Sequence, residues 1–112
     1  MRTAYIAGPM TGLPEHNYPA FFEAEEQIKA VFPHLVLKNP ARTEFDDGGV
    51  VGSLSQTEYL KTGFDLLLDC DAIFLLPGWT RSSGAKAELQ LALALQLKVY
   101  YVDEYGKVAF IS

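Results

Sequence analysis

Residues 71–102 read DAIFLLPGWTRSSGAKAELQLALALQLKVYYV. The apolar run Asp71–Leu76 ends at Pro77 and Gly78, which is typical of a buried strand closed by a turn. The alanine- and leucine-rich sequence from Ser83 to about Leu97 predicts a helix, and Lys98–Val102 predicts another strand. A strand, a helix and a second strand in succession indicate a right-handed crossover between parallel strands.

The flanking sequence extends this alternation in both directions. Further strands are predicted at residues 3–7, 35–37 and 108–111, and further helices at residues 19–32 and from Ser55 or Thr57 to Leu68. The apolar stripes of these two helices are expected to include Val31 and Leu68. The pattern predicts one α/β domain spanning residues 1–112, a three-layer sandwich with a mainly parallel sheet of four to five strands.

Composition narrows the class of protein. The 112 residues carry a net charge of −5, which argues against binding to nucleic acid polymers or anionic membranes. The single cysteine, Cys70, excludes an internal disulfide and suits a reducing compartment. Met1 leads directly into a predicted strand without signal-peptide features, and no apolar run approaches membrane-spanning length. We therefore expect a cytoplasmic protein without a membrane partner.

The carboxyl ends of the predicted parallel strands indicate where a ligand binds. Such sheets bind ligands in a crevice at these ends. Here the ends are Gly8-Pro9-Met10, Asn39-Pro40 and Pro77-Gly78-Trp79. The long irregular segment from Ala41 to Ser55 has two open interpretations, a lid or binding loop and a disordered segment.

Glu88 is out of place on its predicted helix. Lys86 and Gln90 share the polar side, whereas Glu88 points nearly the opposite way, beside Ala85, Ala92 and Leu95. A carboxylate on an apolar face is costly to desolvate. One interpretation is that it complements the helix dipole, although with Ser83 as the cap it would lie in the second turn. The small neighbouring alanines favour the other interpretation, a carboxylate facing a ligand.

The start of that helix offers hydroxyl and N–H groups for an anion, from Ser82, Ser83 and Gly84. A plain N-cap is the competing interpretation. The chain lacks the P-loop and the Gly-x-Gly-x-x-Gly pattern. His16 and His34 are not spaced with Cys70 as metal ligands, so we predict no metal site, no cofactor and no Ser-His-Asp mechanism.

Four segments together resemble the nucleoside 2-deoxyribosyltransferase-like superfamily, and most closely its small uncharacterised phage and bacterial branch. They are Tyr5-Ile-Ala-Gly-Pro-Met-Thr-Gly12, Asn17-x-Pro-Ala-Phe21, Asn39-Pro40, and Cys70-Asp-Ala-Ile73 continuing through Leu76-Pro-Gly-Trp-x-x-Ser-x-Gly-Ala-x-x-Glu88. The resemblance covers nearly the whole chain.

The resemblance implies a flavodoxin-like (Rossmann-like) fold and cleavage of the N-glycosidic bond of a nucleoside or nucleotide. Glu88 matches the nucleophile that forms a covalent glycosyl intermediate before a second base or water accepts the sugar. Tyr5 and Gly8 match a Tyr-x-x-Gly segment near that nucleophile, and Asp71 matches an aspartate that supports the site. A carboxylate nucleophile suits this chemistry because the transition state is oxocarbenium-like.

The phosphate requirement is left open by the same resemblance. Ser82 matches a serine that binds the 5′-phosphate in related 2′-deoxynucleoside 5′-phosphate N-hydrolases. Those enzymes also use an arginine in the first loop, where this chain has Thr11. Whether Arg81 takes the place of that arginine is open. Three acidic residues are unranked candidates for protonating the leaving base: Asp46, Asp65 and Asp69.

Several candidates also have a structural interpretation. Tyr5 and Met10 would simply pack if they served only the core, and Asp71 would cap a loop if it did not support the site. Trp79 would either stack on a base or contact another protein. Asn17 is expected to hold the first loop rather than touch substrate.

Three classes of function follow: an enzyme, a nucleotide-binding module without turnover, and a structural assembly protein. The first has the best support. The resemblance also implies a homo-oligomer (dimer or higher). The aromatic C-terminal part would either supply the interface or form an ordinary core strand, through Tyr100, Tyr101, Tyr105 and Phe110.

Overall fold

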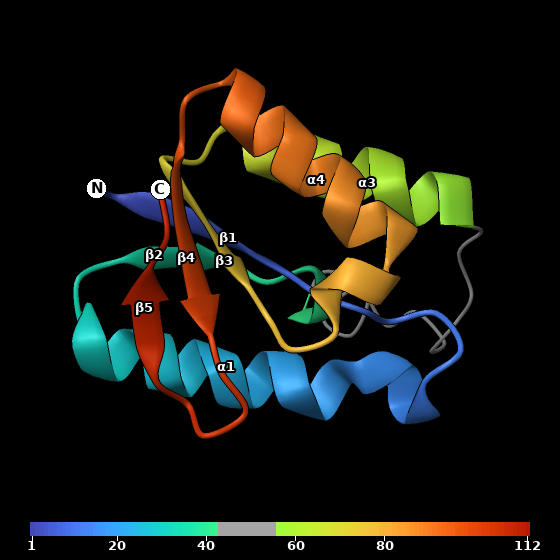
Figure 1. Cartoon of the computed structure of the whole chain (residues 1–112), viewed down its shortest axis with the longest axis horizontal. Coiled ribbons are helices and arrows are strands. Elements are labelled where there is room, and N and C mark those ends of the chain that lie inside the picture. Colours follow the sequence, from blue (N-terminus) through green and yellow to red (C-terminus); the bar gives the residue numbers. More distant parts are fainter. Residues whose placement is uncertain (43–55) are drawn as a thin grey trace.

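The computed structural model describes residues 1–42 and 56–112, which form an α/β sandwich around a five-stranded sheet (Figure 1). The strand order is β2-β1-β3-β4-β5. The first four strands are parallel, and β5 pairs with β4 in the antiparallel direction. This is the flavodoxin-like order, so the predicted fold class is confirmed.

The elements follow one another as predicted, with two additional short 3-10 helices. In chain order they are β1 (Thr3–Ala7), η1 (Pro14–Asn17), α1 (Tyr18–Val31), β2 (Val36–Lys38), α3 (Gln56–Leu68), β3 (Ala72–Leu75), η2 (Trp79–Arg81), α4 (Ser83–Ala94), β4 (Lys98–Val102) and β5 (Val108–Phe110). No helix within the two described ranges has the length and apolar character needed to cross a membrane.

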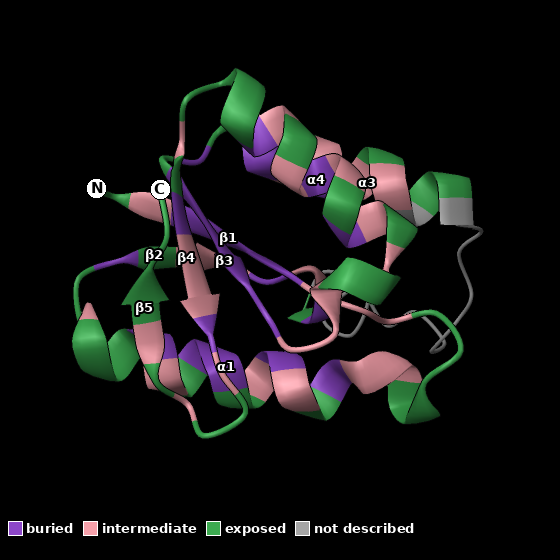
Figure 2. Cartoon of the chain, in the orientation of Figure 1, coloured by how far each residue is buried: buried purple, intermediate pink, exposed green. Residues whose placement is uncertain are grey.

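Helices cover both faces of the sheet. Figure 1 shows α1 on one face and α3 with α4 on the other. Alternate residues of β1 therefore enter different cores: Ala4 and Ile6 pack in the cluster beneath α1, while Tyr5 and Ala7 pack in the cluster beneath α3 and α4. Both layers are apolar, β3 is buried along its length and β1 is buried from Ala4 onward (Figure 2). This alternation directs Tyr5 toward α4.

Several predicted boundaries need correction. The third crossover helix ends at Ala94 rather than near Leu97, because Gln96 takes a left-handed conformation with φ of 60°. Leu95 consequently lies past the helix and is exposed. Val31 and Leu68, predicted to be buried, are also exposed. Each is the last residue of its helix and lies outside the stripe that faces the sheet.

The segment predicted to be irregular from Ala41 is helical at its start, over residues 40–42. The rest of it, residues 43–55, lies outside the described residues, and with it Asp46 and the possible helix cap Ser55. Both interpretations of this segment remain hypotheses.

The aromatic residues near the C-terminus divide between the core and the surface. Tyr100 stacks on Phe74 with a centroid distance of 4.7 Å, and Tyr100 and Phe110 form a T-shaped pair. Tyr105 is 86% exposed, and Phe110 and Ile111 are also largely exposed. The prediction that this part forms an interface therefore stays open for Tyr105 and Phe110, whereas Tyr100 serves the core.

A partly buried ion pair, absent from the sequence-based expectations, holds the residues after β2 against α1. Glu25 is only 4% exposed, and Arg42 donates to both of its carboxylate oxygens, at 2.6 to 3.0 Å. The Arg42 guanidinium also lies over the Phe22 ring. The hydrogen bonds from Arg42 keep the pKa of the Glu25 carboxyl below its ordinary value.

Replacing Arg42 with methionine should destabilise the fold by about 1 to 2 kcal/mol, because Glu25 would remain buried without its cation. Arg42 itself is 48% exposed, which moderates the loss. Since the folded pKa of Glu25 is lowered, the pair stabilises above the unfolded pKa and is lost as pH falls through the folded pKa. Urea unfolding at neutral pH and below pH of about 4 checks this. Lys86→Met is the matched control, and an equal loss in both variants would contradict the assignment.

Candidate functional site

The centre of the site is a buried pair formed by residues from β1 and α4. The Tyr5 hydroxyl donates to Glu88 Oε2 at 2.5 Å. Glu88 is 7% exposed and Tyr5 only 2%. Ala85 and Ala92, one turn before and after Glu88 on the same face, are also buried, while Lys86 and Gln90 are exposed. The predicted orientation of Glu88 is therefore confirmed.

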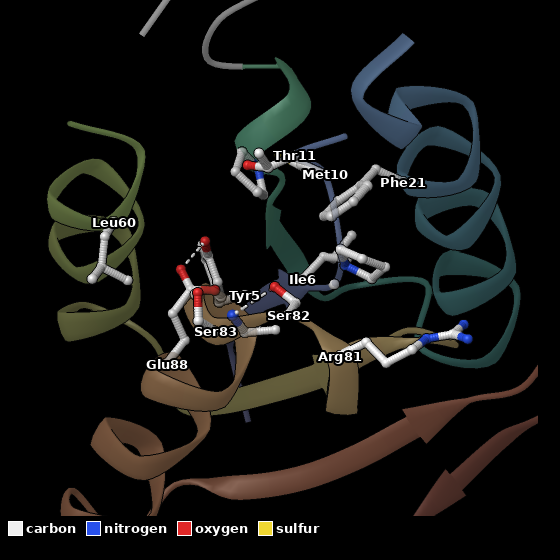
Figure 3. Close-up of a pocket in the computed structure, with 15 residues that line it drawn as sticks. Tyr5, Ile6, Met10, Thr11, Phe21, Leu60, Arg81, Ser82, Ser83 and Glu88 are labelled. Carbon is white, nitrogen blue, oxygen red and sulfur yellow. Dashed lines mark hydrogen bonds between the residues drawn. The ribbon is translucent and has the colours of Figure 1, made fainter. Parts of the chain in front are cut away.

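An open cavity of about 340 Å³ lies beside this pair, at the carboxyl ends of β1 and β3 (Figure 3). One wall is polar and comes from the start of α4. The opposite part is mostly apolar, with side chains from β1, the first loop, α1 and α3. The apolar lining residues outside α4 are Ile6, Pro9, Met10, Phe21, Pro40 and Leu60. The volume and the division into two parts suit a small ligand with one polar and one apolar end.

Among the described residues that line this cavity, Glu88 carries the only carboxyl group. Burial raises its pKa to about 7, although the hydrogen bond from Tyr5 acts in the opposite direction. Burial and the neighbouring Glu88 raise the pKa of Tyr5 well above its ordinary value. Tyr5 therefore remains a neutral donor, while Glu88 changes charge near neutral pH. A carboxylate poised in this way at a cavity is a frequent feature of catalytic sites.

The first turn of α4 forms the polar wall. Ser82, rather than Ser83, is the N-cap: its Oγ accepts a hydrogen bond from the Ala85 N–H at 3.1 Å. Ser82, Ser83 and Gly84 all line the cavity. The first turn of a helix carries N–H groups without intrahelical acceptors, and the helix dipole is positive there. The N-cap interpretation is therefore confirmed, and it is compatible with anion binding at this turn, which stays a prediction.

Most of the residues predicted for the site meet at the cavity. Those that line it are Tyr5, Gly8, Pro9, Met10, Thr11, Ser82, Ser83, Gly84 and Glu88. Arg81 also lines it, but Figure 3 shows its side chain directed away from the Tyr5–Glu88 pair.

Three predicted residues do not line the cavity: Asn17, Trp79 and Asp71. Asn17 donates from Nδ2 to the Pro9 carbonyl at 2.9 Å, so it holds the first loop, as expected. Trp79 packs against the core beneath α3 and α4 instead of lining the cavity.

Asp71 requires a correction, because the structure does not bring it to the site. It precedes β3 and is exposed, and its Oδ2 accepts hydrogen bonds from the backbone N–H groups of Arg2 and Thr3 at 2.8 and 3.0 Å. These bonds lower its pKa. The cavity opens at the carboxyl ends of the strands, whereas Asp71 lies at the amino end of β3. Asp71 therefore fastens the start of β1 to β3.

The candidate acids on α3 and after it are also absent from the cavity lining. Asp65 and Asp69 are exposed and neither lines the cavity. Sequence reasoning missed Leu60 and Phe21 as lining residues. It also missed Gly63, a buried glycine of α3 that packs against the Tyr5–Glu88 pair. A glycine inside a predicted helix was the available signal, because glycine weakens a helix interior and so indicates a packing or functional role there.

The fold and the site define the class of protein: a flavodoxin-like α/β domain with a buried tyrosine–glutamate pair at a cavity beside a helix N-terminus. Residues 2–101 match the family described as a domain of unknown function, DUF4406. The chain belongs to this family. No curated protein matches it.

Proposed function

We propose that this protein cleaves the N-glycosidic bond of a nucleoside or nucleoside 5′-monophosphate, with a 2′-deoxyribosyl group as the expected sugar. The observation that carries the proposal is the buried Glu88 carboxylate, held by Tyr5 at the wall of a cavity of about 340 Å³. The sequence motifs support it further, because they resemble those of the nucleoside 2-deoxyribosyltransferase-like superfamily.

In the proposed reaction Glu88 attacks C1′ of the sugar. The new C1′–O bond replaces the bond between C1′ and the base nitrogen, and the base departs with that electron pair and takes up a proton. A water molecule or a second base then attacks C1′, releases the sugar from Glu88 and loses a proton. The ionised carboxylate also stabilises the positive charge that develops on the sugar.

The hydrogen bond from Tyr5 supports one choice of attacking atom within this proposal. Oε2 of Glu88 accepts the Tyr5 hydroxyl, so Oε1 is the oxygen left for C1′. With the sugar at Glu88, the polar first turn of α4 suits the 5′ side of the substrate, and the apolar lining around Met10 and Phe21 suits the face of a base.

A chromatographic screen of nucleosides and monophosphates tests the proposal. The wild-type protein should release free base from at least one deoxynucleoside or deoxynucleotide, and an added acceptor base separates transfer from hydrolysis. Binding of these compounds without base release from any of them would favour the alternative, a nucleotide-binding module of the same fold. If no compound loses its base and calorimetry detects no binding of any compound, both functions are contradicted.

Ser82→Ala should weaken the use of monophosphates selectively. Ser82 Oγ accepts from Ala85, which leaves its hydroxyl proton free to donate to a phosphate oxygen. Loss of one hydrogen bond to a charged group should raise KM for a monophosphate roughly 10-fold or more. KM for the nucleoside should stay within about 2-fold, and loss of the cap should cost about 1 kcal/mol of stability.

Steady-state kinetics with a matched nucleoside and monophosphate, together with thermal unfolding, check this. Thr80→Ala, which changes an exposed hydroxyl outside the cavity, is the control. An equal change in KM for both substrates would show that Ser82 serves only as the helix cap.

We also propose that the protein acts in the cytoplasm as a homo-oligomer. The largely exposed Tyr105, Phe110 and Ile111 are available for such contacts. Size-exclusion chromatography with light scattering should give at least twice the chain mass, and a monomer at working concentration would contradict the oligomer.

A further inference from the structure

Gly63 packs directly against the reactive pair from the adjacent helix. It lies within α3, is buried, and has no backbone requirement for glycine, because its φ lies outside the left-handed region. A β-carbon built at this position would overlap Glu88 Oε2 and lie 2.6 Å from the Tyr5 hydroxyl oxygen. The Glu88 carboxylate and the Tyr5 hydroxyl therefore occupy the space that the side chain of any larger residue would need.

Glycine in the interior of a helix has an identifiable cost. It destabilises a helix by about 1 kcal/mol relative to alanine, because it loses more backbone freedom on folding. The other α-helical glycine among the described residues, Gly84, differs from Gly63, because a β-carbon there would meet only Ser82 Oγ, at 3.9 Å. The close approach at Gly63 is thus specific to the face of α3 that meets the Tyr5 hydroxyl and the Glu88 carboxylate.

We propose that Gly63 is a positioning residue, whose missing side chain allows Glu88 Oε2 to stay on the Tyr5 hydroxyl and directs Oε1 toward the cavity. The catalytic part of this inference rests on the proposed function, because it concerns the Glu88 oxygen that attacks the sugar. Its structural part, the placement of the carboxylate, is independent of any substrate.

A larger residue at position 63 should displace the carboxylate rather than unfold the protein. The atoms it would meet are the ends of the Glu88 and Tyr5 side chains, and the Glu88 carboxylate can rotate away. Rotation breaks the hydrogen bond to Tyr5. The carboxylate then either remains buried without its donor or turns into the open cavity. Both results change the balance between its charged and neutral forms.

The first test follows Glu88 directly in the folded protein. The carbon-13 signal of its side-chain carboxyl is recorded as pH rises from about 4 to about 9, in the wild type and in Gly63→Ala. The titration midpoint should move by about one unit or more, upward if the group stays buried and downward if it reaches water. Lys61→Ala, an exposed change on the same helix, should leave the midpoint in place. An unchanged midpoint in Gly63→Ala would overturn the proposal.

The second test is a stability comparison in two backgrounds. In the Tyr5→Phe/Glu88→Ala variant, the obstructing atoms are gone, so Gly63→Ala should raise Tm by about 3 °C or more through the helix preference for alanine. In the wild-type background that rise should be absent, because the displaced pair offsets it. The same rise in both backgrounds would overturn the proposal.

Neither measurement needs turnover. If the nucleoside screen fails, the proposed function is rejected, but the titration and the stability comparison still test how Gly63 places Glu88. Success in the screen with an unchanged Glu88 titration in Gly63→Ala would keep the function and reject the role of Gly63.

Discussion

Glu88→Gln should lower the rate of base release by at least about 10,000-fold while substrate binding stays within a few-fold of the wild type. Glutamine has nearly the same shape and its carbonyl oxygen still accepts from Tyr5, but it cannot form the glycosyl ester that the proposed reaction needs. Single-turnover assays and calorimetric titration with a substrate identified in the screen provide the two measurements. Gln90→Ala, on the exposed side of the same helix, is the control.

Intact mass measurement after acid quenching gives a direct check of the covalent step. The wild type should gain the mass of the glycosyl group, and peptide mapping should place it on Glu88. Retained base release in Glu88→Gln, or a label on another residue, would contradict the assignment of the nucleophile.

The stability of the same variant should also depend on pH differently from that of the wild type, which separates loss of activity from loss of folding. The pKa of Glu88 is raised by burial from 4.5 in the unfolded chain to about 7 in the folded protein. Ionisation of Glu88 therefore opposes folding. The free energy of unfolding is highest below the unfolded pKa and falls by about 3 kcal/mol as pH rises through the folded pKa of about 7. Glu88→Gln should thus be more stable than the wild type at about pH 8 and similar to it near pH 4. Loss of activity cannot then be ascribed to unfolding.

The second large effect is the pH dependence of the reaction. Because the attacking group is the ionised carboxylate, kcat/KM should rise roughly 10-fold for each pH unit below a midpoint near 7 and level off above it. Tyr5→Phe removes the donor that favours the ionised form, so the midpoint should move up by about one unit.

Initial rates across the pH range, measured only where the protein is folded, check this profile. Tyr101→Phe retains the Tyr5–Glu88 pair and should keep the wild-type midpoint. A rate that is flat between about pH 5 and pH 8 would show that ionisation of Glu88 does not limit the reaction.

Local patterns in the sequence were sufficient to predict the layers of the fold. The apolar runs at β1, β3 and β4 and the helical spacing of α1 and α4 each report on a short stretch of chain. The orientation of Glu88 was predictable for the same reason, because a rotation of about 100° per residue relates it to Lys86 and Gln90 within a single helix. The errors at Val31, Leu68 and Leu95 occurred at or just beyond helix ends, where the apolar stripe no longer faces the sheet.

Contacts between distant parts of the chain required the tertiary structure. Asp71 was assigned to the site by resemblance, yet its place at the amino end of β3 directs it to the backbone of Arg2 and Thr3. The ion pair of Glu25 with Arg42 likewise depends on how the residues after β2 return to α1. Single-residue patterns carry no information about such pairings.

The sequence by itself determined that a carboxylate at position 88 faces the apolar side of its helix, near strand ends that bind ligands in folds of this type. Only the tertiary structure decided which residues contact the Glu88 carboxylate. Tyr5 is 83 residues away in the chain, and its hydroxyl reaches Glu88 through the strand register and the packing of α4 on the sheet. Gly63 arrives from a third element, α3. The physical reason is that periodicity sets the direction of a side chain, whereas only the packing of separate elements sets its partners.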